Sequence, residues 1–404
     1  MDKKLKKITY GKNVYGKEEI FAVNKVLRKT TQMSKNVFDF ETKVAKLFGM
    51  NYGVMVNSGS SAIILAIKIL GLERNDEVIV PCLNFGTALS SLILFGLKPI
   101  LVDININTLQ IDEKKIVEKI SKKTKALMIP NLIGNLPDWN AISRIAKKYR
   151  LKIIADSADT IGCSFNKKPL GKYADLIITS FYGSHVISCA GNGGMLILNK
   201  KNEYLKAKIL RSWGRLSSIA KDSENIKERL NIKIGGYNYD RKFVFQELGF
   251  NFEPSEIGAA FGLEQLKKLK LFSALRNKNY NHHIFFFKNF SQYFITPKIF
   301  PKVITNFLAY PIIIKENKFF NRRQLQLFLE KKNIQTRPIF SGNILRHPAF
   351  KFLINKNNNI NSYFNADYIM KNGILVGCHQ GLTKKEIIYV HDNIRKFLDK
   401  NCER

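Results

Sequence analysis

A turn of small polar residues follows a short apolar run at residues 54–56 and precedes an apolar helical pattern. It reads Asn57-Ser58-Gly59-Ser60-Ser61. Free backbone N–H groups and the helix dipole suit the start of a helix to a phosphate, and serine hydroxyls add donors. Ser58, Gly59 and Ser60 are therefore candidate phosphate-binding residues. Such turns are also common as plain structure, so this one alone does not decide a function.

A carboxylate and an aromatic residue follow two further apolar runs. Asp156 ends the run at residues 152–156, with Asp159 shortly after it, and Phe85 follows the run at residues 77–81. An aspartate in this position can hold a pyridinium nitrogen protonated, which strengthens pyridoxal phosphate (PLP) as an electron sink. The alternatives are a helix N-cap for Asp156 and a core position for Phe85.

A histidine lies just beyond another apolar run. The run at residues 176–181 contains Ser180 and leads into Tyr182-Gly183-Ser184-His185, and a glycine-rich turn follows at residues 191–194. Imidazole can accept and return a proton near neutral pH, because its unperturbed pKa is about 6.5. A lone histidine is more often structural than catalytic, so the neighbouring features must decide its role.

The elements that must position these residues alternate along the chain. Between residues 50 and 200, short apolar runs alternate with helical patterns, which indicates βαβ units and a mainly parallel sheet in an α/β fold. In such a sheet the ligand lies outside the carboxyl ends of the strands, where the candidate residues fall. We expect strands at residues 54–56, 77–81, 99–104, 126–131, 152–156 and 176–181, and helices at 62–70, 87–95 and 139–149.

The length and composition indicate two domains. A chain of 404 residues favours a large domain and a smaller one, and the composition changes after Phe272. We therefore expect a large domain with the N-terminal segment at residues 1–274 and a small C-terminal α/β domain at residues 275–404. The Asn/Lys-rich stretch at residues 355–361 is interpreted as a surface loop of unknown role.

The charge and cysteine content exclude several classes of partner. The net charge of +34 comes from lysines and arginines spread along the chain, without a nucleic-acid-binding motif. We expect no nucleic-acid partner, although a positive field favours a nucleotide-diphosphate substrate. The five cysteines lack the spacing of a metal site, so neither a metal nor a disulfide is expected. Without a signal segment or a long apolar stretch, the sequence predicts a soluble cytoplasmic protein that makes no membrane contact.

Taken in order, these motifs resemble the sugar-nucleotide aminotransferase family of the fold type I PLP-dependent transferases, over nearly the whole chain. The resemblance implies a large domain with a mainly parallel seven-stranded sheet, bound PLP or pyridoxamine phosphate (PMP), and glutamate as amino donor. It also implies that Asn251 reaches the cofactor phosphate of a neighbouring subunit in a homodimer with shared active sites. The later matching segments are Trp213-Gly214-Arg215, residues 248–251 and residues 259–266.

One position departs from the aminotransferases of this family. Five residues after Ser180 they carry the lysine that binds PLP covalently, and this chain has His185. Imidazole forms no stable imine, so the resemblance implies a cofactor that is held noncovalently. Residues 335–348 and 377–382 resemble the 3-dehydratase branch of the family, whose members also have histidine there. This resemblance implies substrate-binding roles for Arg215, Arg337, Phe340, Asn343 and Arg346.

The resemblance predicts an enzyme that removes the C3 hydroxyl of a nucleotide-diphosphate (NDP) 4-keto-6-deoxyhexose, with His185 as acid and base. Such a reaction belongs to deoxysugar biosynthesis, as for lipopolysaccharide O-antigen. No cysteine lies between Arg211 and Asn251, where CDP-sugar members hold an iron–sulfur cluster, which favours the GDP-linked members. One alternative is an aminotransferase that uses Lys172 or Lys200, and another is an inactive member with a regulatory or scaffold role. The sequence leaves the nucleotide and the sugar configuration open.

Overall fold

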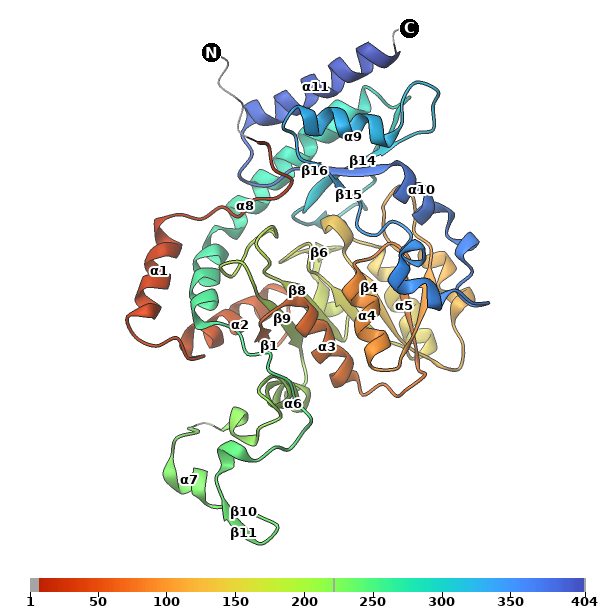
Figure 1. Cartoon of the computed structure of the whole chain (residues 1–404). Helices are drawn as coiled ribbons and strands as arrows, with labels where there is room; N and C mark the ends of the chain where they lie inside the picture. The colour runs from red at the N-terminus through yellow and green to blue at the C-terminus, as the bar shows by residue number, and fades with distance from the viewer. Residues whose placement is uncertain (1–6, 221, 403–404) are drawn as a thin grey trace.

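A seven-stranded sheet forms the centre of the larger unit in the computed structural model, which describes residues 7–220 and 222–402 (Figure 1). The strand order is β1-β9-β8-β5-β4-β2-β3, and only β9 runs antiparallel to its neighbours. The carboxyl ends of the other strands therefore share one edge. The strands are β1 Tyr52–Val56, β2 Glu77–Pro81, β3 Lys98–Val102, β4 Thr124–Pro130, β5 Lys152–Asp156, β8 Leu176–Ser180 and β9 Gly194–Leu198.

This sheet confirms the predicted α/β class. Strands β2 and β5 begin and end where the sequence predicts them, and the other four predicted strands differ from the structure by one or two residues at one or both ends. The prediction missed β9, which follows the glycine-rich turn directly. Its residues are buried throughout, so the sequence shows a short continuous apolar run without the alternation of a half-exposed strand.

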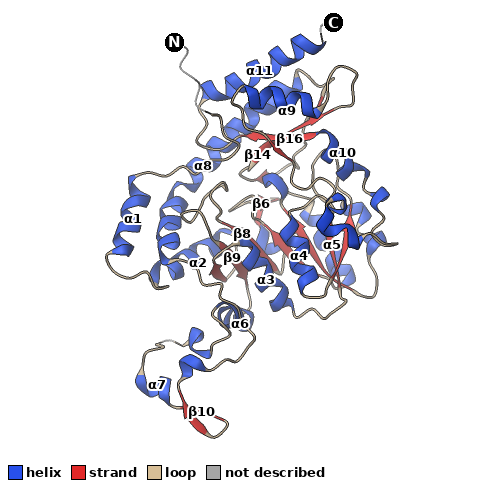
Figure 2. Cartoon of the chain, viewed as in Figure 1, coloured by secondary structure: helices blue, strands red, loops and turns tan. Residues whose placement is uncertain are grey.

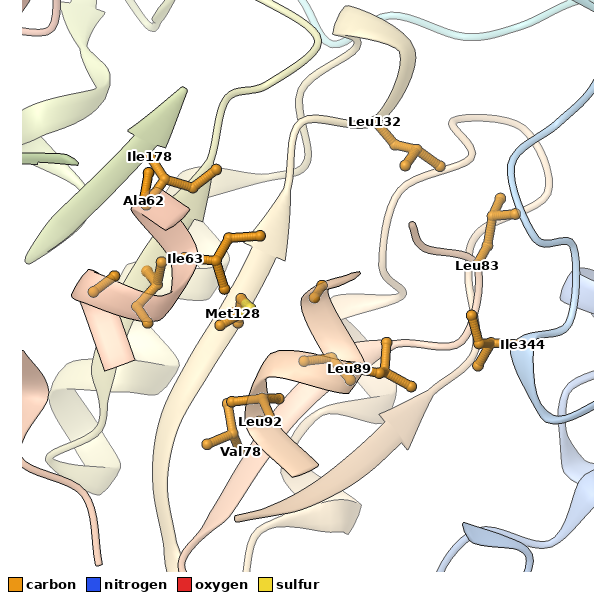
Figure 3. Packing of buried hydrophobic residues seen from close by; sticks show 14 of the residues in the cluster. Ala62, Ile63, Val78, Leu83, Leu89, Leu92, Met128, Leu132, Ile178 and Ile344 are labelled. Carbon is orange, nitrogen blue, oxygen red and sulfur yellow. The ribbon is translucent and has the colours of Figure 1, made fainter. Parts of the chain in front are cut away.

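Side chains alternate between the two faces of the sheet and fill two apolar cores. Val54 and Val56 point into one core while Met55 points into the other. Helices α3 Gly59–Leu70, α4 Gly86–Leu94 and α6 Lys201–Arg211 cover the first core, part of which is drawn in Figure 3. Helices α2 Lys35–Leu47 and α5 Trp139–Tyr149 and the first half of α8 Glu256–Lys288 cover the second.

The smaller unit is built on a four-stranded antiparallel sheet with a separate core (Figure 2). Its strand order is β12-β14-β16-β15. Helix α8 continues from the larger unit into this core, where Tyr280 and Phe287 are buried. The remaining elements of this unit are β12 Phe294–Ile295, β14 Ala309–Ile314, α9 Arg322–Lys331, β15 Arg337–Pro338, α10 Phe364–Asn372, β16 Gly373–Gly377 and α11 Lys384–Cys402.

The predicted boundary between the domains falls within one continuous helix of the structure. Residues 274 and 275 lie inside the continuous helix α8, because the composition change near Phe272 marks a change of neighbours and not the end of an element. The N-terminal segment also packs on the smaller unit. Ile8 N–H donates to the Asn333 carbonyl and Gln335 N–H donates to the Ile8 carbonyl, both at 2.9 Å.

An arm formed by residues 212–251 extends away from the body, at the lower end of Figure 1. It contains α7 Ile226–Leu230, β10 Ile232–Ile234 and β11 Tyr237–Tyr239. Tyr237, Phe245 and Leu248 are all exposed on it.

Across residues 7–220 and 222–402, no helix is long and apolar enough to cross a membrane, and no cluster of His, Cys, Asp or Glu could hold a metal ion. Helix α1 Lys17–Leu27 and a small sheet of β6 Ser164–Phe165, β7 Lys168–Pro169 and β13 Val303–Ile304 complete the fold.

Candidate active site

A pocket of about 350 Å³ lies at the carboxyl edge of the large sheet. The strands end at this edge and deliver their following residues into it, as expected for a parallel sheet. Residues that are far apart in the sequence therefore meet here. The predicted site residues that line this pocket are Ser58, Gly59, Ser60, Phe85, Asp156, Asp159, Ser180, His185 and Phe340.

The predicted phosphate turn forms the first turn of α3. Ser61 N–H donates to the Ser58 hydroxyl at 3.1 Å, so Ser58 is the N-cap. The N–H groups of Gly59 and Ser60 belong to the first turn, which has no helical acceptors for them, and they remain available for an anion. A Cβ on Gly59 would lie 2.9 Å from Ser180 Cβ, so a glycine is required for Ser180 to approach the turn this closely.

Two buried carboxyls stand at the end of β5. Ala158 N–H donates to Asp156 Oδ1 at 2.9 Å, and Ile133 N–H donates to Asp159 Oδ2 at 2.7 Å. Burial raises the pKa of Asp156 to about 6 and the pKa of Asp159 to about 7. Asp156 thus has only one hydrogen bond within the described residues and lacks a cationic partner. A protonated pyridine nitrogen fits this need, because it offers one N–H and one positive charge.

His185 faces the pocket from a tight turn after β8. Its backbone N–H donates to the Tyr182 carbonyl at 2.9 Å, and Nδ1 lies 3.3 Å from the Ser180 carbonyl. A carbonyl can only accept, so Nδ1 carries the proton and Nε2 keeps its lone pair. Burial lowers the pKa of the imidazole to about 4; the charge of Arg276 adds to this effect and the Ser180 carbonyl opposes it. The resting side chain is therefore a neutral base.

The glycine-rich turn closes the loop that carries His185. Gly183 N–H donates to the Gly191 carbonyl at 3.1 Å, and Phe181 N–H donates to the Gly193 carbonyl at 2.9 Å. A Cβ on Gly194 would come within 2.3 Å of the Ser58 carbonyl, so β9 can approach the phosphate turn only with glycine there. The loop that these hydrogen bonds close directs His185 into the pocket.

A second pocket of about 380 Å³ adjoins the first and shares Tyr10, Asn84, Phe85 and Phe340 with it. Arg337 also lines this second pocket. The rings of Phe85 and Phe340 meet edge to face, with centroids 6.4 Å apart. The two pockets together make a continuous space for a ligand larger than the cofactor, with a guanidinium in its outer part.

Three predicted substrate-binding residues, Asn343, Arg346 and Arg215, line neither pocket. Asn343 is buried and accepts from Leu345 N–H at 3.1 Å and from the Cys82 thiol at 2.9 Å. Arg346 forms a two-pronged ion pair with Asp367. Both side chains therefore fix the segment that carries Phe340. The sequence could not reveal this, because Asp367 lies on a different element.

Arg215 and Asn251 lie at the base of the arm, outside the pocket of their own chain. The Arg215 guanidinium stacks 4.0 Å from the centre of the Trp213 ring. Asn251 is exposed, and its backbone pairs with Ser212. If either residue acts in an active site, it must act in the active site of a neighbouring subunit.

Sequence reasoning missed several residues of the pocket. Asn84 is buried at the end of β2, and its Nδ2 has no partner within the described residues. The strand-end rule that selected Phe85 could have selected Asn84 as well. Tyr10 comes from the N-terminal segment, and no sequence signal connected it with the sheet edge.

The described residues that line the pocket include no lysine. Lys200 borders a separate hollow with Lys152 and Asp175, beside the amino ends of β5 and β8. Lys172 lies in the turn that precedes β8, at the same end. Neither of the two lysines considered from the sequence reaches the carboxyl edge.

Comparisons with known proteins agree with this geometry. The DegT/DnrJ/EryC1/StrS aminotransferase family matches residues 13–395. Lipopolysaccharide biosynthesis protein RfbH of Salmonella typhimurium is 31% identical over 90% of this chain and 85% of its own length. GDP-4-keto-6-deoxy-D-mannose 3-dehydratase of Escherichia coli is 31% identical over 93% of this chain and 96% of its own length. The solved structure of an E. coli GDP-4-keto-6-deoxy-D-mannose-3-dehydratase with bound hydrated PLP is similar, with a TM-score of 0.85, 30% identity and coverage of 96% of this chain and 99% of that chain. Relatives named as transaminases match as well, such as dTDP-4-amino-4,6-dideoxy-D-glucose transaminase of Shigella dysenteriae, which is 30% identical over 88% of this chain and 89% of its own length.

Proposed function

This chain belongs to the DegT/DnrJ/EryC1/StrS aminotransferase family, and from that premise we propose that it is a PLP/PMP-dependent 3-dehydratase of an NDP-4-keto-6-deoxyhexose. The relatives named GDP-4-keto-6-deoxy-D-mannose 3-dehydratase favour a GDP-linked substrate. The relative named for lipopolysaccharide biosynthesis favours a role in the supply of O-antigen sugars.

The observation that carries the proposal is His185 in a pocket without a lysine. A lysine would bind the cofactor covalently, and an imidazole leaves it free to enter as the amine form. His185 Nε2 has a free lone pair and can accept a proton, and the same nitrogen can return it, as general acid–base catalysis requires. The Nδ1–H bond to the Ser180 carbonyl keeps the ring oriented during both steps.

The cofactor site follows from the chain's own residues. The first turn of α3 would hold the phosphate, Phe85 would cover the ring, and Asp156 would keep the ring nitrogen protonated. When bound, the cofactor supplies an electron sink that lets the C3 hydroxyl leave. Asp156 is suited to this role because a cation beside it restores the charged carboxylate that burial disfavours.

The second pocket is proposed to hold the nucleotide diphosphate. Arg337 offers a guanidinium for the phosphates, and Phe85 and Phe340 line the region that this space shares with the cofactor pocket. The overall reaction replaces the C3 hydroxyl by hydrogen and converts glutamate into 2-oxoglutarate and ammonia, so that atoms and electrons balance. We further propose a homodimer in which Asn251 and Arg215 act in the neighbouring subunit.

Product analysis tests the function. The enzyme would be incubated with PLP, glutamate and a panel of 4-keto-6-deoxy NDP-sugars, and we expect a product lighter by one oxygen atom together with ammonia. His185→Asn should bind PMP normally and lose the reaction by about 10²–10⁴-fold. A 4-amino sugar that keeps its C3 hydroxyl would support an aminotransferase instead. Dehydration by the asparagine variant at the natural rate would refute His185 as the acid and base.

A further inference from the structure

Arg276 of helix α8 is a fully buried cation directly behind the candidate active site. Its guanidinium donates to four neutral oxygens. These are Gln380 Oε1 at 2.7 Å, the carbonyls of Phe307 at 2.9 Å and Leu308 at 3.1 Å, and the His185 carbonyl at 3.2 Å. Within the described part of the chain, Arg276 has no ion pair. A buried charge without a counter-ion is costly and therefore needs a reason.

Gln380 joins Arg276 to the same loop. Its Oε1 accepts from Arg276 Nε, and its Nε2 donates to the Val186 carbonyl at 3.3 Å. The backbone of two consecutive loop residues is thus held from one side by α8 and by the turn after β16. Gln380 belongs to residues 377–382, which resemble the 3-dehydratase branch in sequence. Its two hydrogen bonds show that this segment holds the His185 loop.

We propose that Arg276 and Gln380 form a clamp that positions His185 and keeps its imidazole neutral until it accepts a proton in the reaction. The two residues act through His185 and touch neither substrate nor cofactor, so they are positioning residues. The inference rests on the proposed function of His185. It adds a specific reason why this histidine can serve as a base.

The electrostatic part depends on what surrounds the imidazole. The positive charge of Arg276 opposes a second positive charge on His185, and burial of the ring acts in the same direction. The carboxyls after β5 line the same pocket and act in the opposite direction where they are ionised. The titratable groups around the loop are Tyr182 on the loop itself, Asp156 and Asp159 after β5, Tyr10 of the N-terminal segment, and Cys378 and His379 after β16.

Two substitutions separate the charge of Arg276 from its hydrogen bonds. Arg276→Gln removes the charge, and Arg276→Lys keeps it while losing the forked geometry. In Arg276→Gln we expect the pKa of His185 to rise and kcat to fall about 10- to 100-fold, with cofactor affinity unchanged. In Arg276→Lys kcat should fall while the pKa of His185 stays near the natural value.

The pKa is measurable without any turnover. Nuclear magnetic resonance of ¹³Cε1-labelled histidine is practical because the chain has six histidines, and the spectrum of His185→Asn assigns the signal. The titration would be recorded on the cofactor-free and the PMP-bound protein. It would be compared with the fall of kcat on the acidic side of its pH profile. If Arg276→Gln instead lowers the melting temperature, the cofactor affinity and kcat together and leaves the pKa of His185 unchanged, Arg276 has a structural role only. That result would overturn the clamp.

Gln380→Glu decides the case if Arg276→Gln does not fold. The glutamate has the same shape, accepts from Arg276 Nε and neutralises its charge, but it cannot donate to the Val186 carbonyl. We again expect a raised pKa of His185 and a lower kcat. Asn279→Ala is the matched control, since Asn279 lies one turn along α8 and donates to the carbonyls of Cys378 and His379 without touching the His185 loop.

The control also separates this inference from the proposed function. If Asn279→Ala reproduces the change in kcat and in the His185 titration, or if Gln380→Glu leaves the titration where it was, the clamp is wrong. If instead His185→Asn retains activity, the proposed role of His185 fails, while the titration still reports whether Arg276 controls the charge of this ring.

Discussion

The chemistry of the pocket depends on one hydrogen bond at His185. The Ser180 carbonyl fixes the proton on Nδ1, and this leaves Nε2 as the only ring nitrogen able to accept one. A lysine at this position would be a stronger nucleophile and a poorly matched base. Its ordinary pKa is about 10.4, far above that of imidazole.

His185→Lys should therefore change how the cofactor is held. We expect PLP to remain bound through gel filtration and to become irreversibly attached after borohydride treatment, while dehydration falls sharply. The natural protein and His185→Asn, treated in the same way, should release their cofactor. Equal retention of PLP by all three proteins would contradict the noncovalent binding inferred for His185.

The buried carboxyl of Asp156 makes the cofactor-free protein sensitive to pH. Its pKa is about 6 in the folded chain against 3.8 for the free side chain, so the folded state holds this proton at pH values where the unfolded state has lost it. Stability therefore decreases as the pH rises from about 4 to 6.

Asp156→Asn should remove this loss and stabilise the cofactor-free protein at pH 8 by on the order of 2–3 kcal/mol. Urea unfolding at about pH 4 and pH 8 measures the change in the free energy of unfolding, and PMP should bind the variant more weakly at pH 8. Identical pH dependence in the two proteins would show that Asp156 is not the cause.

The sequence located the pocket residues that follow strands, and it failed where a partner lay elsewhere in the chain. Asp156 and His185 were found because their strands were continuous apolar runs. Asn343 was assigned to the substrate, and only the structure shows its side chain held by Cys82 and Asp367. The same reason hid Arg276, since nothing in the helical pattern of α8 indicates that its guanidinium meets the His185 loop.

At the scale of elements, the loop at residues 355–361 closes an edge of the large sheet. Asn358 is buried, and its side-chain amide accepts from Leu101 N–H and donates to the Pro99 carbonyl, both at 3.0 Å. It thus pairs with β3 as a neighbouring strand would. Exposed strand edges invite pairing with other chains, so this contact also protects the sheet. The composition of the loop at residues 355–361 predicted a surface loop and did not indicate its contact with β3, because β3 is far away in the sequence.

Asn358→Ala should destabilise the protein. It leaves a buried N–H and a buried carbonyl of β3 without partners, at a cost of about 2–3 kcal/mol. We expect a lower melting temperature and a greater tendency to aggregate. Asn357→Ala is the control, because Asn357 is exposed in the same loop and only its backbone forms hydrogen bonds. Equal melting temperatures for the two variants would mean that the edge contact contributes nothing.

At the scale of the whole molecule, the two units pack together through the first core of the large sheet, whereas none of the buried apolar residues lies in the described part of the arm, residues 212–220 and 222–251. Leu308 and Leu345 of the smaller unit belong to the same apolar cluster as the helices on the large sheet, so the pocket lies between parts that are packed together. Leu248 on the arm is 89% exposed. Tyr237, Phe245 and Leu248 are exposed on the arm and are thus accessible to a second chain, as the proposed homodimer requires.

Mixed dimers test whether each active site takes residues from both chains. A His185→Asn chain and an Asn251→Ala chain would be refolded or coexpressed together and assayed at limiting PMP, where loss of the phosphate contact weakens binding by on the order of 1–3 kcal/mol. If Asn251 acts in the neighbouring subunit, half of the dimers are mixed, and one of the two sites in each mixed dimer has both natural residues. About a quarter of all sites should then be active. If Asn251 acts in its own chain, mixing restores no intact site and activity stays at the average of the two parent proteins. A fully active monomer at working concentration would exclude the shared site altogether.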